Sequence, residues 1–593
     1  MEPQQQVPMS LEGTRPTVRS THGVVASGHL FASLAGLDIL RRGGNAIDAG
    51  VAAGICVNVL HHDMTSFSGV APIMIYLAKE QKIVSISGLG RWPRASSLEY
   101  FWEEQDGQFN DGIAHCVIPA APDAWAMALA RYGTMTLAEV MDAAIGYARD
   151  GFPVHDFMAS SFKSGWEAIQ KWPGSMSVVA PEGKLVGAGD TLVQSDLAHT
   201  LQFMVDAERA HDGDRESGIQ AGRDAFYKGA IAEKFVRFSE ENGGFFSMED
   251  FNDFSVQEEP TVVVDYAGYE VHSSGPWCQG PVLAQALSIL KNIDLKSMRH
   301  NSPQYIHAVA EALNLAFADR EFYYGDPEFV DVPMDALVSD EYGQLRASLI
   351  RSEKAWGELP PPGDPTTLQA TRSDYQWPPA GDWLTVRKAM KESPLEPDTS
   401  HVSAIDRDGN MFAATPSDTF TTHLSPPLVP GVGLPLSGRG RQSRLDPKHP
   451  ACIAPWKRPR LTPSPALILK DGKPFMTLGT PGGDIQPQAM LQVFLNVVVF
   501  GMAPQVAVEA PRFGSYSHPN SFYPHGYKPG MLRVESRVDD SVLDQLRSWG
   551  HTVEAWPART GRAGAVLISG IPLPNGTWQS AADNRRESIA LGW

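Results

Sequence analysis

The sequence predicts an α/β protein in which helices are layered against sheets. Two patterns indicate this fold class: long segments whose apolar residues recur at helical spacing, and short apolar or β-branched runs that are typical of strands. Helices are expected at residues 31–42, 46–60, 192–207, 279–293 and 302–318, and strands at residues 73–77, 83–86 and 261–272.

The first of these elements follow a polar lead over residues 1–22. Residues 23–29 predict a strand and a turn, and two glycines end the helix over residues 31–42. Residues 46–60 are small and apolar on nearly every face. This pattern favours a helix that is packed against a sheet.

A threonine opens a predicted hairpin in the last third of the chain. Thr399 begins a run of small and β-branched residues, Gly409 and Asn410 supply a turn, and the apolar run 411–414 predicts the return strand. Taken alone, Thr399 at this place is an ordinary strand-forming residue.

Two adjacent glycines separate another predicted strand, residues 474–478, from a long apolar helix, residues 489–500. Gly482 and Gly483 would leave backbone N–H groups exposed at the start of that helix, where negative charge is favoured. A plain tight turn explains the same residues, so the pattern alone leaves both interpretations open.

Charge and cysteine usage exclude several classes of function. The chain has 49 Lys and Arg against 68 Asp and Glu, a formal charge of −19, which argues against a nucleic-acid partner. Four scattered cysteines without CxxC spacing indicate neither a zinc site nor a disulfide framework. His61, His62 and Asp63 are interpreted as a helix-end loop, because three adjacent residues cannot all face one ion. No metal is expected, and without a dinucleotide or P-loop motif no cofactor is expected.

The N-terminal lead lacks the basic and then apolar profile of a secretory signal. No apolar run reaches the ~18 residues that a membrane span needs. We therefore expect no membrane association and a cytoplasmic location.

Several motifs together resemble the γ-glutamyltranspeptidase (glutathione hydrolase) family. They are Thr399-Ser400-His401 with Asp406, Gly409 and Asn410; Gly-Gly-Asn-Ala-x-Asp-Ala over residues 43–49; Lys-Arg-Pro over residues 457–459; and Gly-Thr-Pro-Gly-Gly-Asp over residues 479–484. The resemblance runs from about residue 23 to the C-terminus. It implies the four-layer αββα sandwich of the N-terminal nucleophile hydrolases.

The resemblance also implies self-cleavage between Asp398 and Thr399. A large segment, residues 23–398, would then stay associated with a small segment, residues 399–593, and residues 356–398 would form an exposed linker before the cut. The freed Thr399 α-amine titrates near pH ~8, so it can serve as the base for its own hydroxyl.

The family pattern assigns further roles by position. Ser417 would hydrogen-bond the nucleophile, and the Gly482 and Gly483 amides would form the oxyanion hole, where losing one donor typically costs ~3 to 4 kcal/mol. The expected substrate is a small γ-glutamyl or acyl amide, with water or an amine as acceptor. Its candidate binding residues are Arg91, Arg94, Thr419, Arg439, Thr462 and Asp484.

The chain departs from the family at three places that would grip a glutamyl group. Leu89 stands where the family has a carboxylate-binding Arg, and Leu461 replaces the first of two paired serines. The loop over residues 431–441 is basic and lacks the expected acid. Three functions therefore stay open: γ-glutamyl hydrolase or transferase, an acylase-type amide hydrolase on the same fold, and a catalytically silent binding protein.

Overall fold

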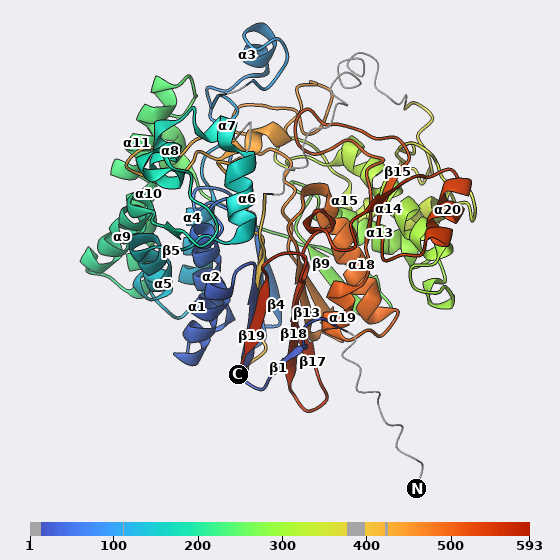
Figure 1. Cartoon of the computed structure of the whole chain (residues 1–593). Helices are drawn as coiled ribbons and strands as arrows, with labels where there is room; N and C mark the ends of the chain where they lie inside the picture. Colours follow the sequence, from blue (N-terminus) through green and yellow to red (C-terminus); the bar gives the residue numbers. More distant parts are fainter. Residues whose placement is uncertain (1–12, 111, 376–397, 422–424) are drawn as a thin grey trace.

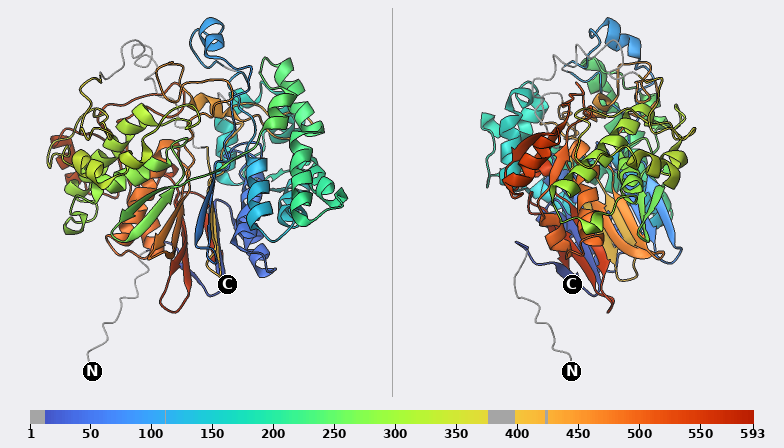
Figure 2. Two further views of the ribbon diagram at one scale, coloured as in Figure 1. Left: turned by 180° about the vertical axis from the view of Figure 1, so that it is seen from behind. Right: turned by 90° about the vertical axis from the view of Figure 1, so that its right-hand side faces the viewer.

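The computed structural model describes residues 13–110, 112–375, 398–421 and 425–593. Two large antiparallel sheets pack face to face at its centre, with helices on both outer faces (Figure 1; Figure 2, left). The four layers are helix, sheet, sheet and helix. This arrangement confirms the αββα sandwich that the resemblance implied.

The first sheet has seven strands, in the order β1 (Val18–Ser20), β18 (Trp578–Ala582), β17 (Leu567–Pro572), β13 (Lys473–Gly479), β12 (Ala466–Lys470), β9 (Tyr269–Ser273) and β8 (Val262–Tyr266). The second also has seven, in the order β19 (Ile589–Gly592), β2 (Gly23–Ser27), β10 (Val402–Asp406), β11 (Met411–Ala414), β3 (Ile73–Leu77), β4 (Lys82–Ile86) and β7 (Glu258–Glu259). Each sheet therefore interleaves strands from before and after Thr399.

The two sheets are joined by an apolar layer to which both contribute. Its members alternate along their strands with residues that face the helices, as the period of two in a strand requires. The layer is formed by Val24, Met74, Tyr76, Ile405, Met411, Ala413, Leu467 and Leu469.

Helices on the second sheet form the larger core. They are chiefly α1 (Leu30–Arg41), α2 (Ala46–Leu60), α4 (Ala121–Tyr132), α5 (Leu137–Asp150), α9 (Ser195–Ala210), α10 (Arg215–Tyr227) and α11 (Ala230–Glu241). The first sheet is covered by α13 (Gly280–Leu290), α14 (Pro303–Tyr323), α18 (Gln486–Val498), α19 (Pro504–Glu509) and α20 (Asp540–Ser548).

Shorter elements complete the described chain: α3 (Leu98–Glu103), α6 (Asp156–Ser164), α7 (Trp166–Ile169), α8 (Pro173–Val179), α12 (Met248–Asp253), α15 (Met334–Leu337), α16 (Asp340–Ala347), and the small sheets of β5 (Phe152–Pro153) with β6 (Thr191–Leu192) and of β14 (Phe513–Ser515), β15 (Met531–Glu535) and β16 (Thr552–Trp556). None of the helices in the described ranges is long and apolar enough to cross a membrane.

Helix α2 shows how the sequence positions the centre of the molecule. Asn45 caps its N-terminus and Asp48 completes a capping box, so the helix starts directly after Gly43 and Gly44. Every residue of α2 is buried, in line with a sequence that is small and apolar on nearly every face. The helix ends at Leu60 with His61 as its C-cap, and it packs against β10, the strand that follows Thr399.

Three expectations differ from the structure. Residues 261–272 form a hairpin of two strands, because Ala267 and Gly268 take left-handed backbone angles at a turn. Part of the polar lead joins the first sheet as β1. In the expected linker, residues 359–363 are mostly buried, and the Gly363 N–H donates to Asp319; residues 376–397 lie outside the described ranges.

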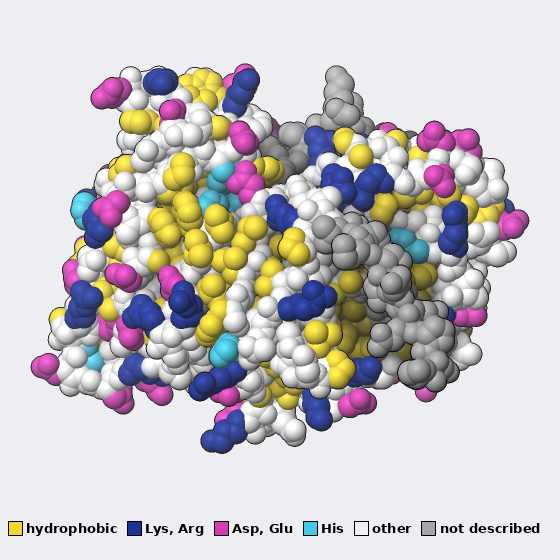
Figure 3. Space-filling view, turned by 60° about the horizontal axis from the view of Figure 1, so that its bottom comes forward, with side chains coloured by type: hydrophobic (Ala, Val, Ile, Leu, Met, Phe, Trp, Pro, Cys, Tyr) yellow, Lys and Arg dark blue, Asp and Glu magenta, His cyan; other side chains and the backbone are white. Residues whose placement is uncertain are grey.

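The surface carries both signs of charge. Figure 3 shows one face, on which Lys and Arg side chains are interspersed with Asp and Glu and do not merge into a continuous basic field.

Candidate active site

Thr399 lies just before β10, between the two sheets, and is 1% exposed. Its Oγ1 is 2.7 Å from Ser417 Oγ, and Ser417 Oγ donates a 2.9 Å hydrogen bond to the carbonyl oxygen of Asp398. Backbone hydrogen bonds with Val70 fix the position of Ser417. The candidate nucleophile, its orienting hydroxyl and the carbonyl of the Asp398–Thr399 bond thus form one hydrogen-bonded chain.

The proton count of Ser417 gives this chain a direction. A serine hydroxyl has one proton and two lone pairs. The carbonyl of Asp398 can only accept, so Ser417 uses its proton there; its lone pairs face Thr399 Oγ1 and a nitrogen of Arg439. Thr399 must then donate its hydroxyl proton to Ser417. Ser417 accepts from the attacking group and polarises the carbonyl under attack.

Arg439 occupies a 3₁₀ turn, η3 (Gly438–Gln442), and is 1% exposed. Its Nη2 lies 2.6 Å from Asp398 Oδ2 and 2.6 Å from Ser417 Oγ, and its Nε lies 3.6 Å from Asp418 Oδ2. Burial raises the pKa of Asp418, and the Arg439 charge opposes that rise. The guanidinium therefore has one close carboxylate, the side chain that precedes the scissile bond.

His401 is buried beside the candidate nucleophile but is not equipped to act as a base. Burial lowers the pKa of His401 to about 3, and its Nδ1 lies 3.0 Å from Thr415 Oγ1. The ring packs flat on the backbone of Gly479, where an added Cβ would lie 2.1 Å from a ring carbon. Gly479 is therefore required by a close approach.

Gly482 and Gly483 form the turn that leads into α18. Both have positive φ, 129° and 58°, and η4 (Gly483–Ile485) follows at once. In the described part of the chain neither N–H group meets an acceptor. The Phe522 ring links this turn to Arg439: it is 5.5 Å from the guanidinium carbon, and a Cβ on Gly483 would lie 3.7 Å from it.

Asp484 does not present a free carboxylate to this space. Arg320 Nη1 donates to it at 2.6 Å, and the Ser521 N–H and hydroxyl donate at 2.7 and 2.6 Å. Burial alone would raise the pKa of Asp484, but Arg320 and the Ser521 donors hold it below its ordinary value. No sequence pattern singled out Arg320, which stands in the long helix α14.

Thr462 belongs to the same side of the site. Gln442 Nε2 donates to its hydroxyl at 2.8 Å. Gln279 Nε2 donates to the carbonyls of Thr462 and Gly483, at 3.0 and 2.8 Å. The structure therefore brings Thr462 next to the two-glycine turn.

Arg91 and Arg94 are placed elsewhere, on carboxylate partners of their own. Arg91 pairs with Glu328 at 2.5 Å, and Arg94 stacks on Trp456 at 3.7 Å and bonds to Asp253. The hydroxyl of Thr419 donates to the carbonyl of Asp63 at 2.6 Å. Within the described ranges, these three candidates make no hydrogen bond to Thr399 or Ser417.

Leu89 and Leu461 belong to one buried apolar cluster. Its members are Val70, Leu89, Trp277, Cys278 and Leu461. Val70 is the residue whose backbone pairs with Ser417. The two positions that the family uses for a carboxylate are thus both apolar and lie in one cluster that reaches the hydroxyl network.

Two groups of three His, Asp or Glu side chains in the described ranges are close enough to hold a metal ion: His61, Asp63 and His155; and His307, Glu311 and His551. Neither includes Thr399. The sequence analysis found no further ligand for residues 61–63, because His155 lies far away in the sequence, at the start of α6.

Comparison with known proteins agrees with the geometry. The family model for gamma-glutamyltranspeptidase matches residues 32–593. The glutathione hydrolase proenzyme of Escherichia coli (strain K12) is 30% identical over 585 residues, covering 96% of this chain and 91% of that protein. The solved structure of LmbA2991HD is 33% identical with a TM-score of 0.87, covering 98% and 100% of the two chains. Cephalosporin acylase from Bacillus halodurans is 26% identical with a TM-score of 0.83, covering 100% and 99%.

Proposed function

Because the chain belongs to the γ-glutamyltranspeptidase family, we propose that it is cut between Asp398 and Thr399 and that Thr399 then cleaves γ-glutamyl amide bonds, of the glutathione type, with water or an amine as acceptor. The observation that carries this proposal is the hydrogen-bonded chain from Thr399 Oγ1 through Ser417 Oγ to the Asp398 carbonyl.

Processing needs only groups in this chain and one water. Thr399 Oγ1 passes its proton to Ser417, and Ser417 passes its own proton to the Asp398 carbonyl oxygen, as Oγ1 bonds to the Asp398 carbonyl carbon. The proton moves to the Thr399 nitrogen as the C–N bond breaks, which leaves an ester and a free α-amine. Water then hydrolyses the ester, so Asp398 departs as a carboxylic acid and Thr399 regains its hydroxyl.

In the mature enzyme the α-amine takes the proton from Thr399 Oγ1 as this atom attacks the acyl carbon. The Gly482 and Gly483 amides stabilise the oxyanion, and the leaving amine takes up the proton. Water or an acceptor amine releases the acyl group. The segments stay together because the second sheet combines β2, β3 and β4 with β10, β11 and β19.

Arg439 supplies a candidate contact for the acyl group. It holds the Asp398 side chain while the Asp398 carbonyl is attacked by Thr399. Once Asp398 leaves, Asp418 at 3.6 Å is the one carboxylate that stays beside the guanidinium among the residues that the structure describes. A substrate acyl group with its own carboxylate, such as γ-glutamyl, would restore the lost pair.

An acylase-type specificity is the second candidate, and the apolar cluster around Leu89 and Leu461 favours it. That cluster offers no hydrogen bond to an amino-acid carboxylate and suits an acyl chain without one. The similarity to a cephalosporin acylase supports the same reading.

The first test is the intact mass and N-terminal sequence of the purified protein. We expect the wild-type protein to give a fragment that begins Thr-Ser-His-Val. The Thr399→Ala variant is expected to stay uncut, even after long incubation. Ser417→Ala is expected to slow cleavage by about 100-fold, the cost of one transition-state hydrogen bond near a charge. A wild-type chain that folds and stays whole would place the silent binding protein first.

The second test compares how fast the processed enzyme turns over three anilide substrates: γ-glutamyl-, glutaryl- and pentanoyl-p-nitroanilide. They share the amide and differ in the α-amine and the distal carboxylate. Efficient γ-glutamyl turnover supports the main proposal, and a preference for glutaryl or pentanoyl supports the acylase. No turnover of any of them by processed enzyme, together with no covalent labelling of Thr399, would contradict both.

A further inference from the structure

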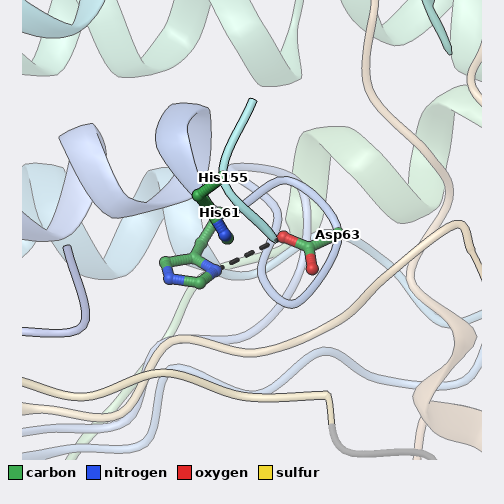
Figure 4. Close-up of side chains that lie close together, drawn as sticks. All are labelled: His61, Asp63 and His155. Atoms are coloured by element: carbon green, nitrogen blue, oxygen red, sulfur yellow. Dashed lines mark hydrogen bonds and ion pairs between the residues drawn. The ribbon is translucent and has the colours of Figure 1, made fainter. Parts of the chain in front are cut away.

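A buried cluster of imidazole and carboxylate groups lies where α2 ends and α6 begins. His61 is the C-cap of α2, Asp63 follows in the loop, and His155 is the N-cap of α6. One ligand atom from each lies within 4.8 Å of those from the other two (Figure 4). The side chains of His61 and Asp63 are 5% and 0% exposed, and that of His155 is 10% exposed.

The ring of His61 is oriented with a lone pair toward Asp63. Its Nε2 lies 3.1 Å from the Gly28 carbonyl, which can only accept, so Nε2 carries a proton. In the neutral ring Nδ1 is then an acceptor, yet it faces Asp63 Oδ1 at 3.3 Å. Two acceptors face each other, an arrangement that a cation between them would satisfy.

A protonated ring would also join the two groups, but the distance is long for that interaction. Hydrogen bonds between a charged imidazole and a carboxylate are ~2.7 to 2.9 Å long. Two ligands bound at ~2.1 Å to a tetrahedral ion lie about 3.4 Å apart. The 3.3 Å between His61 Nδ1 and Asp63 Oδ1 matches the ligand spacing.

His155 presents its other nitrogen to the same space. Glu587 Oε2 lies 3.0 Å from Nδ1 and the Met158 N–H donates to the same nitrogen at 3.1 Å, so Nδ1 faces two partners outside the cluster. Nε2 is buried and has no hydrogen bond of normal geometry among the described residues, although the Leu60 carbonyl is near the ring. A carboxylate beside the outer nitrogen of a histidine is typical of metal ligands.

The second cluster shows what a complete hydrogen-bonded account looks like. His307 Nε2 lies 2.6 Å from the Arg351 carbonyl and carries a proton, so Nδ1 accepts from His551 Nε2 at 2.8 Å. This distance is an N–H···N hydrogen bond and is too short for two ligands of one tetrahedral ion. No cation is needed there, and the second cluster becomes the natural control.

We propose that His61 Nδ1, Asp63 and His155 Nε2 bind one divalent transition-metal ion of the zinc type. Two neutral imidazoles and one carboxylate suit Zn²⁺, with water as a fourth ligand. The ion would tie the end of α2 to the start of α6.

This site adjoins the candidate active site without belonging to it. The hydroxyls of Thr419 and Thr421 both donate to the Asp63 carbonyl. Gly28, which accepts from His61, lies against the Ser400 hydroxyl, since a Cβ on Gly28 would sit 2.1 Å from it. The bound ion would therefore brace the loop under the residue that follows Thr399.

The test is metal binding by the full-length wild-type protein, purified without a histidine tag and stripped with chelator. Isothermal titration with Zn²⁺ is expected to give about one site per chain. His155→Gln is expected to weaken binding by at least tenfold. Glu587→Gln removes only the outer carboxylate of a half-exposed side chain and is expected to weaken binding about 10- to 100-fold.

His551→Gln is the matched control, because it removes a histidine from the second cluster and should leave Zn²⁺ stoichiometry and affinity unchanged. Absence of a Zn²⁺ site in the wild type would overturn the proposal. So would equal affinity in Glu587→Gln and wild type, which tests the site even if His155→Gln does not fold. Loss of binding in His551→Gln would assign the ion to the other cluster and also reject the proposal.

Discussion

Arg320 and Arg439 are both fully buried near the same two-glycine turn, but their charges are balanced in different ways. Arg320 pairs with Asp484 at 2.6 Å and with Glu321 at 2.8 Å, and both partners lie within folded segments. Among the described residues, the carboxylate nearest to Arg439 is that of Asp398 at 2.6 Å, which ends the segment before the proposed cut, and Asp418 lies farther away at 3.6 Å.

The difference separates a structural cation from an available one. Arg320 keeps its partners whether or not the chain is cut, so its charge stays paired in both forms. In the proposed mechanism, Arg439 would exchange Asp398 for the group that enters the site after processing. Leaving a buried charge without a partner costs free energy. The mature site should therefore bind acyl groups that carry a carboxylate more tightly than those without one.

Removing Arg320 should have the largest effect on stability. Arg320→Met leaves the buried Asp484 carboxylate without its cation, and breaking such a pair typically costs about 3 to 5 kcal/mol. Urea unfolding of the variant, made in a Thr399→Ala background to keep the chain uncut, measures this loss. Lys291→Met, which removes an exposed partner of Asp340, is the control and should change the free energy of unfolding by less than about 1 kcal/mol.

Arg439→Met should affect catalysis more than folding of the processed enzyme. A charged hydrogen bond contributes about 1.5 to 3 kcal/mol, so kcat/KM for γ-glutamyl- or glutaryl-p-nitroanilide should fall about 10- to 100-fold. Turnover of the pentanoyl anilide, which has no carboxylate, should change little. An equal loss with all three substrates would mean that Arg439 acts on Ser417 and not on the acyl group.

Asp398→Asn tests the precursor side of the comparison. The amide cannot form the ion pair with Arg439, so cleavage should slow by about tenfold, from the weaker of the values for a charged hydrogen bond. Time courses of the fragment that begins at Thr399 measure the rate. The cleaved variant has the same small segment as the wild type and should therefore match its anilide turnover; a lower turnover would show that Asp398 stays bound after the cut.

Local motifs predicted the parts of this site that local backbone geometry creates. Thr399 at a strand start and Gly482 and Gly483 between a strand and a helix are contiguous patterns, and the family resemblance named their roles. The same holds for α2, which is small and apolar on nearly every face. The four-layer order of the sheets came from the resemblance, because pairing β10 with β2 depends on contacts across most of the chain.

The partners of buried charges could not be read in this way. Arg439 was singled out as basic, but its pairing with Asp398 depends on how η3 folds back on the cut site. Asp484 was expected to bind substrate, but its carboxylate is paired with Arg320, which stands on α14. His155 lies near His61 because the start of α6 packs beside the end of α2. Each contact is set by tertiary packing, which carries no signal in neighbouring residues.

The acids beside the two arginines should respond to pH with opposite signs. Arg320 and the Ser521 donors hold the pKa of Asp484 below its ordinary value, against the effect of burial, whereas burial raises the pKa of Asp418 despite Arg439. A lowered pKa contributes stability that is present above the unfolded value of about 3.9 and is lost as pH falls toward the folded value. A raised pKa contributes stability that is present below about 3.9 and is lost as pH rises through the folded value.

Unfolding free energies from pH 3 to 7, in the Thr399→Ala background, distinguish the two. The advantage of the parent over Asp484→Asn should be largest near neutral pH and shrink on acidification, because the carboxylate that pairs with Arg320 becomes protonated. The parent should gain on Asp418→Asn as pH falls, because the folded state then binds the proton that burial favours. The same slope for both variants would show that Arg439 balances Asp418 as fully as Arg320 balances Asp484, and the distinction between a structural and an available cation would fail.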